Sequence, residues 1–222
     1  MSNLVVAIDG PSGSGKSTVA RGLARALGLH TLDTGAMYRA VTLAALDAGI
    51  SLAAADSLAD VARRSHIDLD NGIVVLDGRD VHDAIRGPEV TAAVSAVSAH
   101  PVVRAVLVDR QRAWVAEHGG GVVEGRDIGT IVFPDAPVKV FITATDAERA
   151  RRRGLDEAAA ARDADVDTLQ RAMAARDDAD ATLGRALRPE QAAPDALVID
   201  TTDREADSVI AEIVIRVEAV PR

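Results

Sequence analysis

The 222-residue chain contains no cysteine, few aromatic residues and only two lysines, Lys16 and Lys139. Without cysteine, neither a disulfide framework nor thiol catalysis is available. Aromatic residues make up 2% of the chain, too few for a surface that stacks the bases of single-stranded nucleic acid. The net charge of −9 also opposes binding to a phosphate backbone. We therefore expect no nucleic-acid partner.

Long apolar runs are absent too. No stretch of 18 apolar residues suggests a membrane span, and no signal-peptide pattern comes before the first apolar segment. We accordingly expect a cytoplasmic protein without membrane contact. The length suits one domain over residues 1–222, and we expect a monomer.

The lysine at position 16 lies in the segment 10–17, Gly-Pro-Ser-Gly-Ser-Gly-Lys-Ser, which has the P-loop pattern G-x-x-x-x-G-K-[ST]. Apolar residues 5–8 before it predict a buried strand, and residues 17–27 after it predict a helix. A chance glycine-rich turn is the alternative, and the strand–turn–helix context counts against it. A dinucleotide-binding G-x-G-x-x-G pattern is excluded, because no third glycine follows Gly15 at the required spacing.

A P-loop binds nucleotide phosphates through inward-pointing backbone N–H groups and the positive end of the following helix. The slim ammonium of Lys16 suits a ring of backbone amides better than a planar guanidinium does. We expect Lys16 to reach the β- and γ-phosphates of ATP, and the Ser17 hydroxyl to ligate Mg²⁺. The expected ATP site comprises Gly10, Pro11, Ser12, Gly13, Ser14, Gly15, Lys16, Ser17 and Thr18.

Strand and helix signals alternate along the chain. Short runs rich in valine and isoleucine, typical of a parallel sheet covered on both faces, occur at 4–8, 121–124, 138–143 and 196–199. Helical patterns occur at 36–48, 101–117, 146–153 and 204–219. This alternation predicts an α/β fold with a central parallel sheet covered by helices.

One segment departs from the alternation. Residues 66–69 and 73–76 flank Asp70-Asn71-Gly72, and Asn-Gly between alternating residues is a strong hairpin signal. The hairpin indicates a small insert at about 60–98. The alternative is an antiparallel extension at the edge of the main sheet.

The stretch 146–188 is dense in alanine, arginine and aspartate. It predicts two helices joined near residues 163–167. Two interpretations stay open: a solvated, salt-bridged helical pair, or a lid whose arginines face ATP.

A second motif, Leu-Asp-Thr-Gly-Ala-Met-Tyr-Arg at residues 32–39, follows a short strand and begins a helix. Asp33 or Thr34 is suited to cap that helix. Capping does not explain Arg39, because an arginine in the first turn is disfavoured by the helix dipole. We infer that Arg39 points at a bound anion.

A third motif occupies residues 122–130, where an apolar strand ends in Glu-Gly-Arg-Asp-Ile-Gly-Thr. Ligands of open α/β sheets bind beyond the carboxyl ends of the strands. Arg126 is suited to clamp a phosphate bidentately, and Asp127 to accept a hydrogen bond from a substrate amine or hydroxyl. The alternative is a salt bridge within the loop. A fourth segment, 176–185, is explained equally well as a capped helix end.

Together the segments 9–17, 32–39, 124–139 and 195–202 resemble the bacterial cytidylate kinases, which phosphorylate CMP or dCMP. The resemblance implies a nucleoside monophosphate kinase with ATP as donor and Mg²⁺ as cofactor. It implies a core (about 1–59, 99–148 and 189–222), an NMP-binding insert (about 60–98) and a lid (about 149–188).

The resemblance also implies roles for individual residues, with Lys16, Arg126 and Asp127 as the catalytic set. The CMP site would comprise Thr34, Arg39 and Arg126 at the phosphate, Ser95, Arg104 and Asp127 at the cytosine, Arg176 and Asp180 at the sugar, Arg185 at the phosphate, and Tyr38. Arg149 and Arg153 are the candidates for lid contacts to ATP. Asp180 and Arg185 are five residues apart where the family has Asp-x-x-Arg, which makes Arg188 an alternative to Arg185.

We expect in-line phosphoryl transfer driven by positioning and charge neutralisation. Two alternatives are another small P-loop kinase with a different acceptor and a regulatory P-loop NTPase. A second anion site built from Arg39, Arg126 and Arg185 counts against the NTPase, because a switch protein needs no acceptor.

Overall fold

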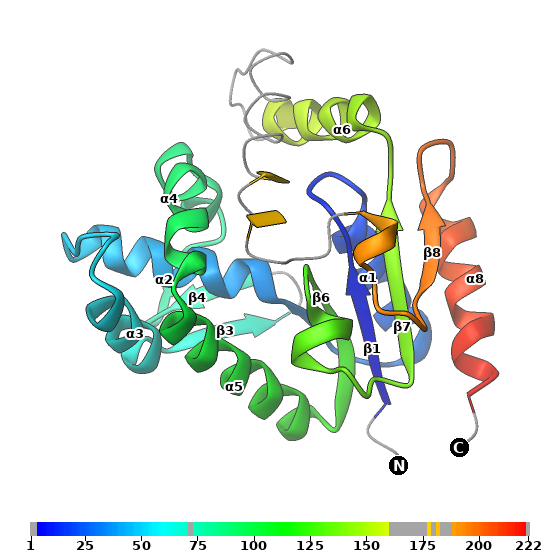
Figure 1. Cartoon of the computed structure of the whole chain (residues 1–222), viewed down its shortest axis with the longest axis horizontal. Coiled ribbons are helices and arrows are strands. Elements are labelled where there is room, and N and C mark those ends of the chain that lie inside the picture. The colour runs from blue at the N-terminus through cyan, green and yellow to red at the C-terminus, as the bar shows by residue number, and fades with distance from the viewer. Residues whose placement is uncertain (1–3, 71–72, 160–176, 179–180, 183–187, 221–222) are drawn as a thin grey trace.

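Five short strands form a parallel sheet in the order β2-β6-β1-β7-β8 (Figure 1). The computed structural model describes residues 4–70, 73–159, 177–178, 181–182 and 188–220. The strands are β1 (Leu4–Asp9), β2 (Thr31–Asp33), β6 (Gly120–Gly125), β7 (Val138–Thr143) and β8 (Leu197–Asp200). The predicted strand 138–143 has the observed bounds, and the other three are confirmed with ends shifted by one residue.

Helices cover both faces of this sheet because its strands are apolar on both sides. Val6 and Ile8 of β1 pack with α1 (Lys16–Leu27) and α8 (Ala206–Glu218) on one face. Val5 and Ala7 of the same strand belong to the cluster on the opposite face. That cluster is formed with α2 (Thr34–Asp47), α3 (Ala55–Arg64) and α5 (Pro101–His118).

The predicted hairpin forms a second, separate sheet. Strands β3 (Ile67–Asp70), β4 (Ile73–Leu76) and β5 (Arg79–Asp80) pair antiparallel in that order. An extension at the edge of the main sheet was the alternative, and it is wrong, because these strands pack through Val74 and Leu76 against α2. The Asn-Gly turn itself lies outside the described residues.

A proline begins each of the next two helices. The turn η1 (Ala84–Arg86) leads into α4 (Pro88–Ala99), and α5 follows after one residue. Pro88 and Pro101 each occupy the first turn of their helix, where a missing N–H costs nothing. His100 before Pro101 is extended, as the residue before a proline prefers, and the chain therefore bends sharply there.

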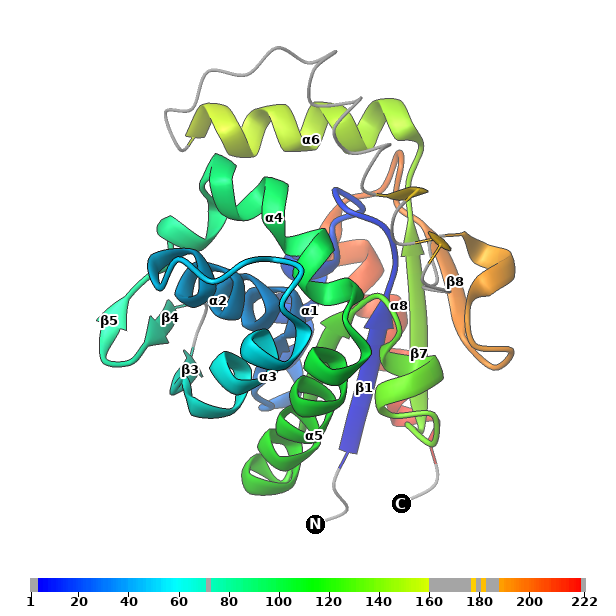
Figure 2. The same cartoon turned by 60° about the vertical axis from the view of Figure 1, so that its left-hand side comes forward.

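Three further elements precede or follow strands of the main sheet, whose carboxyl end carries the P-loop. A turn of π-helix, η2 (Ile128–Val132), follows β6, and the short η3 (Pro189–Gln191) precedes β8. Helix α6 (Asp146–Ala159) follows β7 and crosses this end of the molecule in both views (Figure 2). It continues six residues beyond the predicted end at 153.

Within the described residues, no single helix has the length and apolar composition needed to cross a membrane. Helices α4 and α5 meet those two criteria only when taken together, and they are bent by 96° at their junction.

Candidate active site

The P-loop links β1 to α1 through a turn that only glycine can adopt. Gly10 has a φ of 145°, and a Cβ there would lie 2.0 Å from the carbonyl oxygen of Ile142. Gly13 has a φ of 76°, and a Cβ there would lie 2.7 Å from the carbonyl oxygen of Arg149. The loop therefore passes close beneath both β7 and α6, and the glycines of the motif are required by this packing as well as by phosphate binding.

Lys16 is buried at the start of α1, where its Nζ donates to the carbonyl oxygen of Pro11 at 2.7 Å. The ammonium of Lys16 therefore lies against the backbone of the P-loop, as predicted from the sequence. Ser14 Oγ is also buried, and it has no hydrogen-bond partner among the described atoms. The loop therefore encloses the ammonium of Lys16, and it also holds one buried hydroxyl whose hydrogen-bonding capacity is unused.

Glu124, at the end of β6, has no role in the sequence prediction but belongs to the site. Its Oε2 accepts a hydrogen bond from Ser17 Oγ at 2.9 Å, and the residue is 7% exposed. Burial raises the pKa of Glu124 to about 7, with a further increase from Asp33 and a decrease from Lys16 and Ser17. A serine hydroxyl beside a carboxylate is an oxygen pair of the kind that Mg²⁺ prefers.

The start of α2 is tied to the end of β6. Asp33 caps the helix by accepting from the backbone N–H of Ala36 at 3.0 Å, and Thr34 Oγ1 donates to the carbonyl oxygen of Glu124 at 2.8 Å. The helix begins at Thr34, two residues before the predicted start, because Asp33 supplies the cap. Arg39 consequently lies in the second turn, and its predicted place in the first turn was wrong.

Arg39 has the environment expected of an anion ligand. Its Nη1 donates to two neutral oxygens, the carbonyl of Ile85 and the hydroxyl of Thr91, each at 2.9 Å. Burial lowers the pKa of Arg39 to about 10, and the charges of Arg153, Arg86 and Arg126 lower it further, while Asp33 opposes them. Guanidinium groups from α2, α6, η1 and the loop after β6 therefore act on one another. This concentration of positive charge favours a bound anion.

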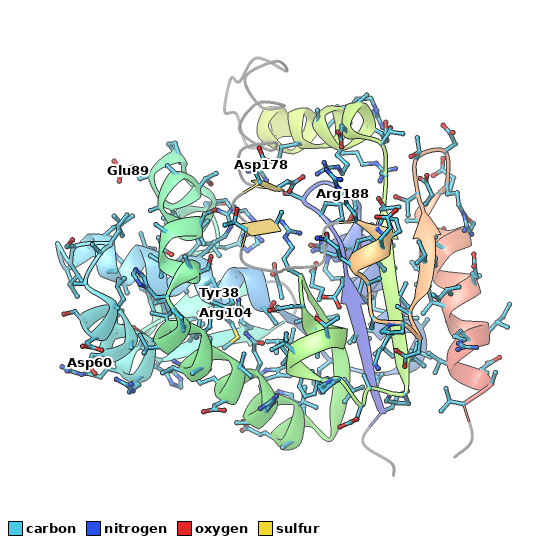
Figure 3. All side chains as sticks on the ribbon, viewed as in Figure 1. Tyr38, Asp60, Glu89, Arg104, Asp178 and Arg188 are labelled. Atoms are coloured by element: carbon cyan, nitrogen blue, oxygen red, sulfur yellow. The ribbon has the colours of Figure 1, made fainter. Side chains whose placement is uncertain are left out.

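Arg126 and Asp127 point in different directions from the loop after β6. Arg126 Nη1 donates to the carbonyl oxygen of Gly10 in the P-loop at 2.5 Å. Asp127 forms an ion pair with Arg104 of α5, whose position is labelled in Figure 3. The salt bridge considered within the loop is therefore not formed between neighbours but joins the loop to α5. Arg126 bonds to the P-loop and also lies close enough to Arg39 to lower its pKa.

Asp9 is a second carboxylate to which the sequence analysis assigns no role. Its two oxygens accept from the backbone N–H groups of Ile128 and Gly129, each at 2.7 Å. Burial raises the pKa of Asp9 to about 6, and Asp127 raises it further, whereas the two backbone bonds and Lys16 lower it. Asp9 and Glu124 share one sequence signal that could have been used: each is an acidic residue at the end of an apolar strand.

Two arginines of α6 lie near the site: Arg149 contacts the P-loop, and Arg153 lies near Arg39 of α2. Arg149 Nη1 donates to the carbonyl oxygen of Ser12 at 2.9 Å and pairs with Asp177 at 2.7 Å. Arg152, which the sequence analysis did not single out, donates to the hydroxyl and carbonyl of Thr201. Arg153 is close enough to Arg39 to lower its pKa.

Two further predicted CMP ligands are half-buried: Tyr38 on α2 (labelled in Figure 3) and Ser95 on α4. Arg176, Asp180 and Arg185 lie outside the described residues. Arg188, the alternative to Arg185, is described; it is exposed and precedes η3.

Comparison with known proteins places this site in a family. A family model described as cytidylate kinase matches residues 6–219. The cytidylate kinase of Mycobacterium avium (strain 104) is 51% identical over 212 residues, which cover 94% of this chain and 92% of the relative. That of Rhodococcus opacus (strain B4) is 48% identical over 218 residues, which cover 96% and 94%.

Solved structures show the same fold at low identity. A shikimate kinase from Acinetobacter baumannii in complex with shikimate has a TM-score of 0.50 at 14% identity, and the match covers 99% of this chain and 97% of the other. An uncharacterized protein from Eubacterium ventriosum ATCC 27560 has a TM-score of 0.54 at 13% identity, with coverage of 97% and 99%. These likenesses support the P-loop kinase fold, and the sequence matches decide the membership: the chain belongs to the cytidylate kinase family.

Proposed function

We propose that this protein transfers a phosphoryl group from ATP to CMP or dCMP. The observation that carries the proposal is the pair of facing anion sites. The P-loop with buried Lys16 supplies the first, and the arginine group around Arg39 supplies the second. Arg126 joins them through its hydrogen bond to the carbonyl oxygen of Gly10. Two anion sites that touch suit transfer between two nucleotides better than hydrolysis of one.

The chemistry asks for alignment and charge neutralisation more than for a strong base, because a phosphate oxygen is already a nucleophile. We propose that Lys16 follows the transferred group, while Arg39 and Arg126 hold the acceptor phosphate. Thr34, tied to the carbonyl of Glu124, would support the same phosphate. Arg153 would neutralise charge from the α6 side.

Mg²⁺ is proposed to bind at Ser17 and Glu124. These residues fit a magnesium ion chemically. The Ser17 hydroxyl and the buried Glu124 carboxylate share a hydrogen bond at 2.9 Å, and burial makes that carboxylate costly to ionise without a cation nearby. When bound, the ion would neutralise charge on the donor phosphates.

Base selection is proposed to depend on the ion pair of Arg104 and Asp127 together with Ser95. A site whose polar groups are already aligned rejects an analogue that leaves one of them unpaired. The roles of Tyr38, Arg149, Arg176, Asp180 and Arg185 in binding nucleotides, and the division into core, insert and lid, remain predictions. So do the cytoplasmic location and the monomeric state.

The deciding experiment is an assay of ADP release against a panel of acceptors: CMP, dCMP, UMP, AMP, GMP and shikimate. We expect rapid turnover with CMP and dCMP and slow turnover with the others. Turnover with shikimate or a purine nucleotide in preference to CMP would contradict the proposal. ADP release at the full rate without any acceptor would point instead to an NTPase.

A further inference from the structure

Asp9 connects the last residue of β1 with the first turn of η2, 119 residues later in the chain. Its Oδ1 accepts from Ile128 N–H and its Oδ2 from Gly129 N–H, each at 2.7 Å. Both residues directly follow Arg126 and Asp127, which form the short loop between β6 and η2, here called the acceptor loop. A rigid hold on the backbone at Ile128 and Gly129 therefore limits where Arg126 and Asp127 can point.

A carboxylate is the side chain that suits this task. Two consecutive N–H groups need two acceptors, and only an ionised carboxyl group offers two equivalent oxygens. An asparagine would offer one oxygen and would turn an NH₂ group toward the second N–H. The charged form has a cost at this position, because Asp9 is 5% exposed and burial is the largest factor that raises its pKa to about 6.

Gly129 of η2 is packed between Asp9 and the side chain of Lys139. A Cβ at Gly129 would lie 3.3 Å from Asp9 Oδ2 and 3.3 Å from both Cγ and Cδ of Lys139. The stem of Lys139 thus packs over Gly129, while its ammonium pairs with Asp195 at 2.9 Å. The charges that act on Asp9 are Asp127 in the acceptor loop and Lys16 of α1.

We propose that Asp9 is a positioning residue for the acceptor nucleotide: by holding the N–H groups of Ile128 and Gly129 it aims Arg126 at the phosphate and Asp127 at Arg104 and the base. This inference rests on the proposed phosphorylation of CMP. Asp9 acts through the loop backbone and touches neither nucleotide. Its loss is therefore expected to weaken the acceptor selectively.

The test uses Asp9→Asn in the full chain, with Asp195→Asn as matched control. The control removes the exposed partner of Lys139 and leaves the acceptor loop with both of its hydrogen bonds. Isothermal titration calorimetry then gives the dissociation constants of CMP and ATP separately. We expect Asp9→Asn to weaken CMP about tenfold, because the backbone that aims Arg126 and Asp127 loses one of its two fixed hydrogen bonds, with ATP changed less than about twofold. The control is expected to bind both nucleotides as the wild type does.

A second readout concerns the wild type alone. The amide resonances of Ile128 and Gly129 in a ¹⁵N-labelled sample are expected to move between pH 5 and pH 8 with a midpoint near 6, as their shared acceptor is titrated. This measurement needs neither a nucleotide nor a folded variant. Both amides remaining still while the Asp9 carboxyl carbon, followed in a ¹³C-labelled sample, titrates would overturn the proposal, as would equal weakening of CMP and ATP, or unchanged CMP binding, in a folded Asp9→Asn protein. Failure of the wild type to bind or phosphorylate CMP would instead refute the proposed function.

Discussion

Replacing Arg39 with methionine is expected to separate acceptor binding from stability. Burial, together with the charges of neighbouring arginines, lowers the pKa of Arg39 to about 10, which corresponds to about 3 kcal/mol of unfavourable free energy for the charged side chain in the folded protein. Its hydrogen bonds to Ile85 and Thr91 return about 1 kcal/mol each. We therefore expect Arg39→Met to raise the free energy of unfolding by about 1 kcal/mol, because methionine fills the space without the charge.

The same substitution is expected to weaken CMP strongly. Hydrogen bonds to a charged phosphate contribute about 1.5–3 kcal/mol each, and the loss of one or two of them lowers affinity about 100-fold, at 1.4 kcal/mol for each factor of ten. ATP affinity is expected to stay near that of the wild type. The measurements are urea unfolding followed by circular dichroism and isothermal titration calorimetry with each nucleotide.

Arg110→Met is the matched control. Arg110 on α5 also has a pKa lowered by burial, but its Nη1 donates to the carbonyls of Ala62 and Ser65 at the end of α3. We expect this control to lose about 1 kcal/mol of stability, since helix-end carbonyls lose their donor, and to bind CMP normally. The reasoning would be refuted if Arg39→Met were destabilised like the control, or if it kept the CMP affinity of the wild type.

Three further predictions concern the loop lysine, the base and the effect of pH. Lys16→Met is expected to lower turnover at least about 1,000-fold with an unchanged melting curve, because charge on the moving phosphoryl group loses its partner; a folded variant with full activity would contradict this. Arg104→Ala removes the partner of Asp127, so the ratio of kcat/KM for CMP to that for UMP is expected to fall at least about tenfold; an unchanged ratio would place base recognition elsewhere. The folded-state pKa of Asp9 is raised from 3.8 to about 6, so its contribution to stability is greatest at low pH and declines as pH rises through 6. Between pH 4 and pH 7, the free energy of unfolding of the wild type should fall by about 2 kcal/mol relative to Asp9→Asn. Parallel stability–pH curves for the two proteins in urea titrations would rule this out.

The features predicted correctly from the sequence are mostly local. The P-loop needs glycines, a lysine and a serine at fixed spacing within eight residues, and the buried strand at 138–143 is rich in valine, isoleucine and phenylalanine. The resemblance to cytidylate kinases came from motifs with the same local character, and the family match confirms it. The predicted start of α2 was two residues late. Both Asp33 and Thr34 were suited to be the cap; in the structure Asp33 caps the helix, while the Thr34 hydroxyl donates to the carbonyl of Glu124 in β6.

The sequence carried only a weak signal for Asp9 and Glu124, because the groups that they bind are distant along the chain. Each was visible as an acidic residue ending an apolar strand, a pattern that an exposed strand end also shows. Asp9 gains its role from backbone N–H groups 119 residues away, and Glu124 from Ser17, 107 residues away. The α6 arginines are a similar case: position alone did not show that Arg149 would reach the carbonyl of Ser12.

The sequence by itself determined the class of chemistry, because phosphate binding by a P-loop depends on neighbouring backbone groups and on the lysine that follows them. It also determined the alternation of strands and helices, since that pattern is set by which residues are apolar. Only the tertiary structure decided which side chains of distant segments lie close together. It brought Arg39, Arg86, Arg126 and Arg153 close enough to act on one another, and it tied the acceptor loop to Asp9. Such contacts depend on the packing of β1, β6 and α6, to which distant segments contribute jointly.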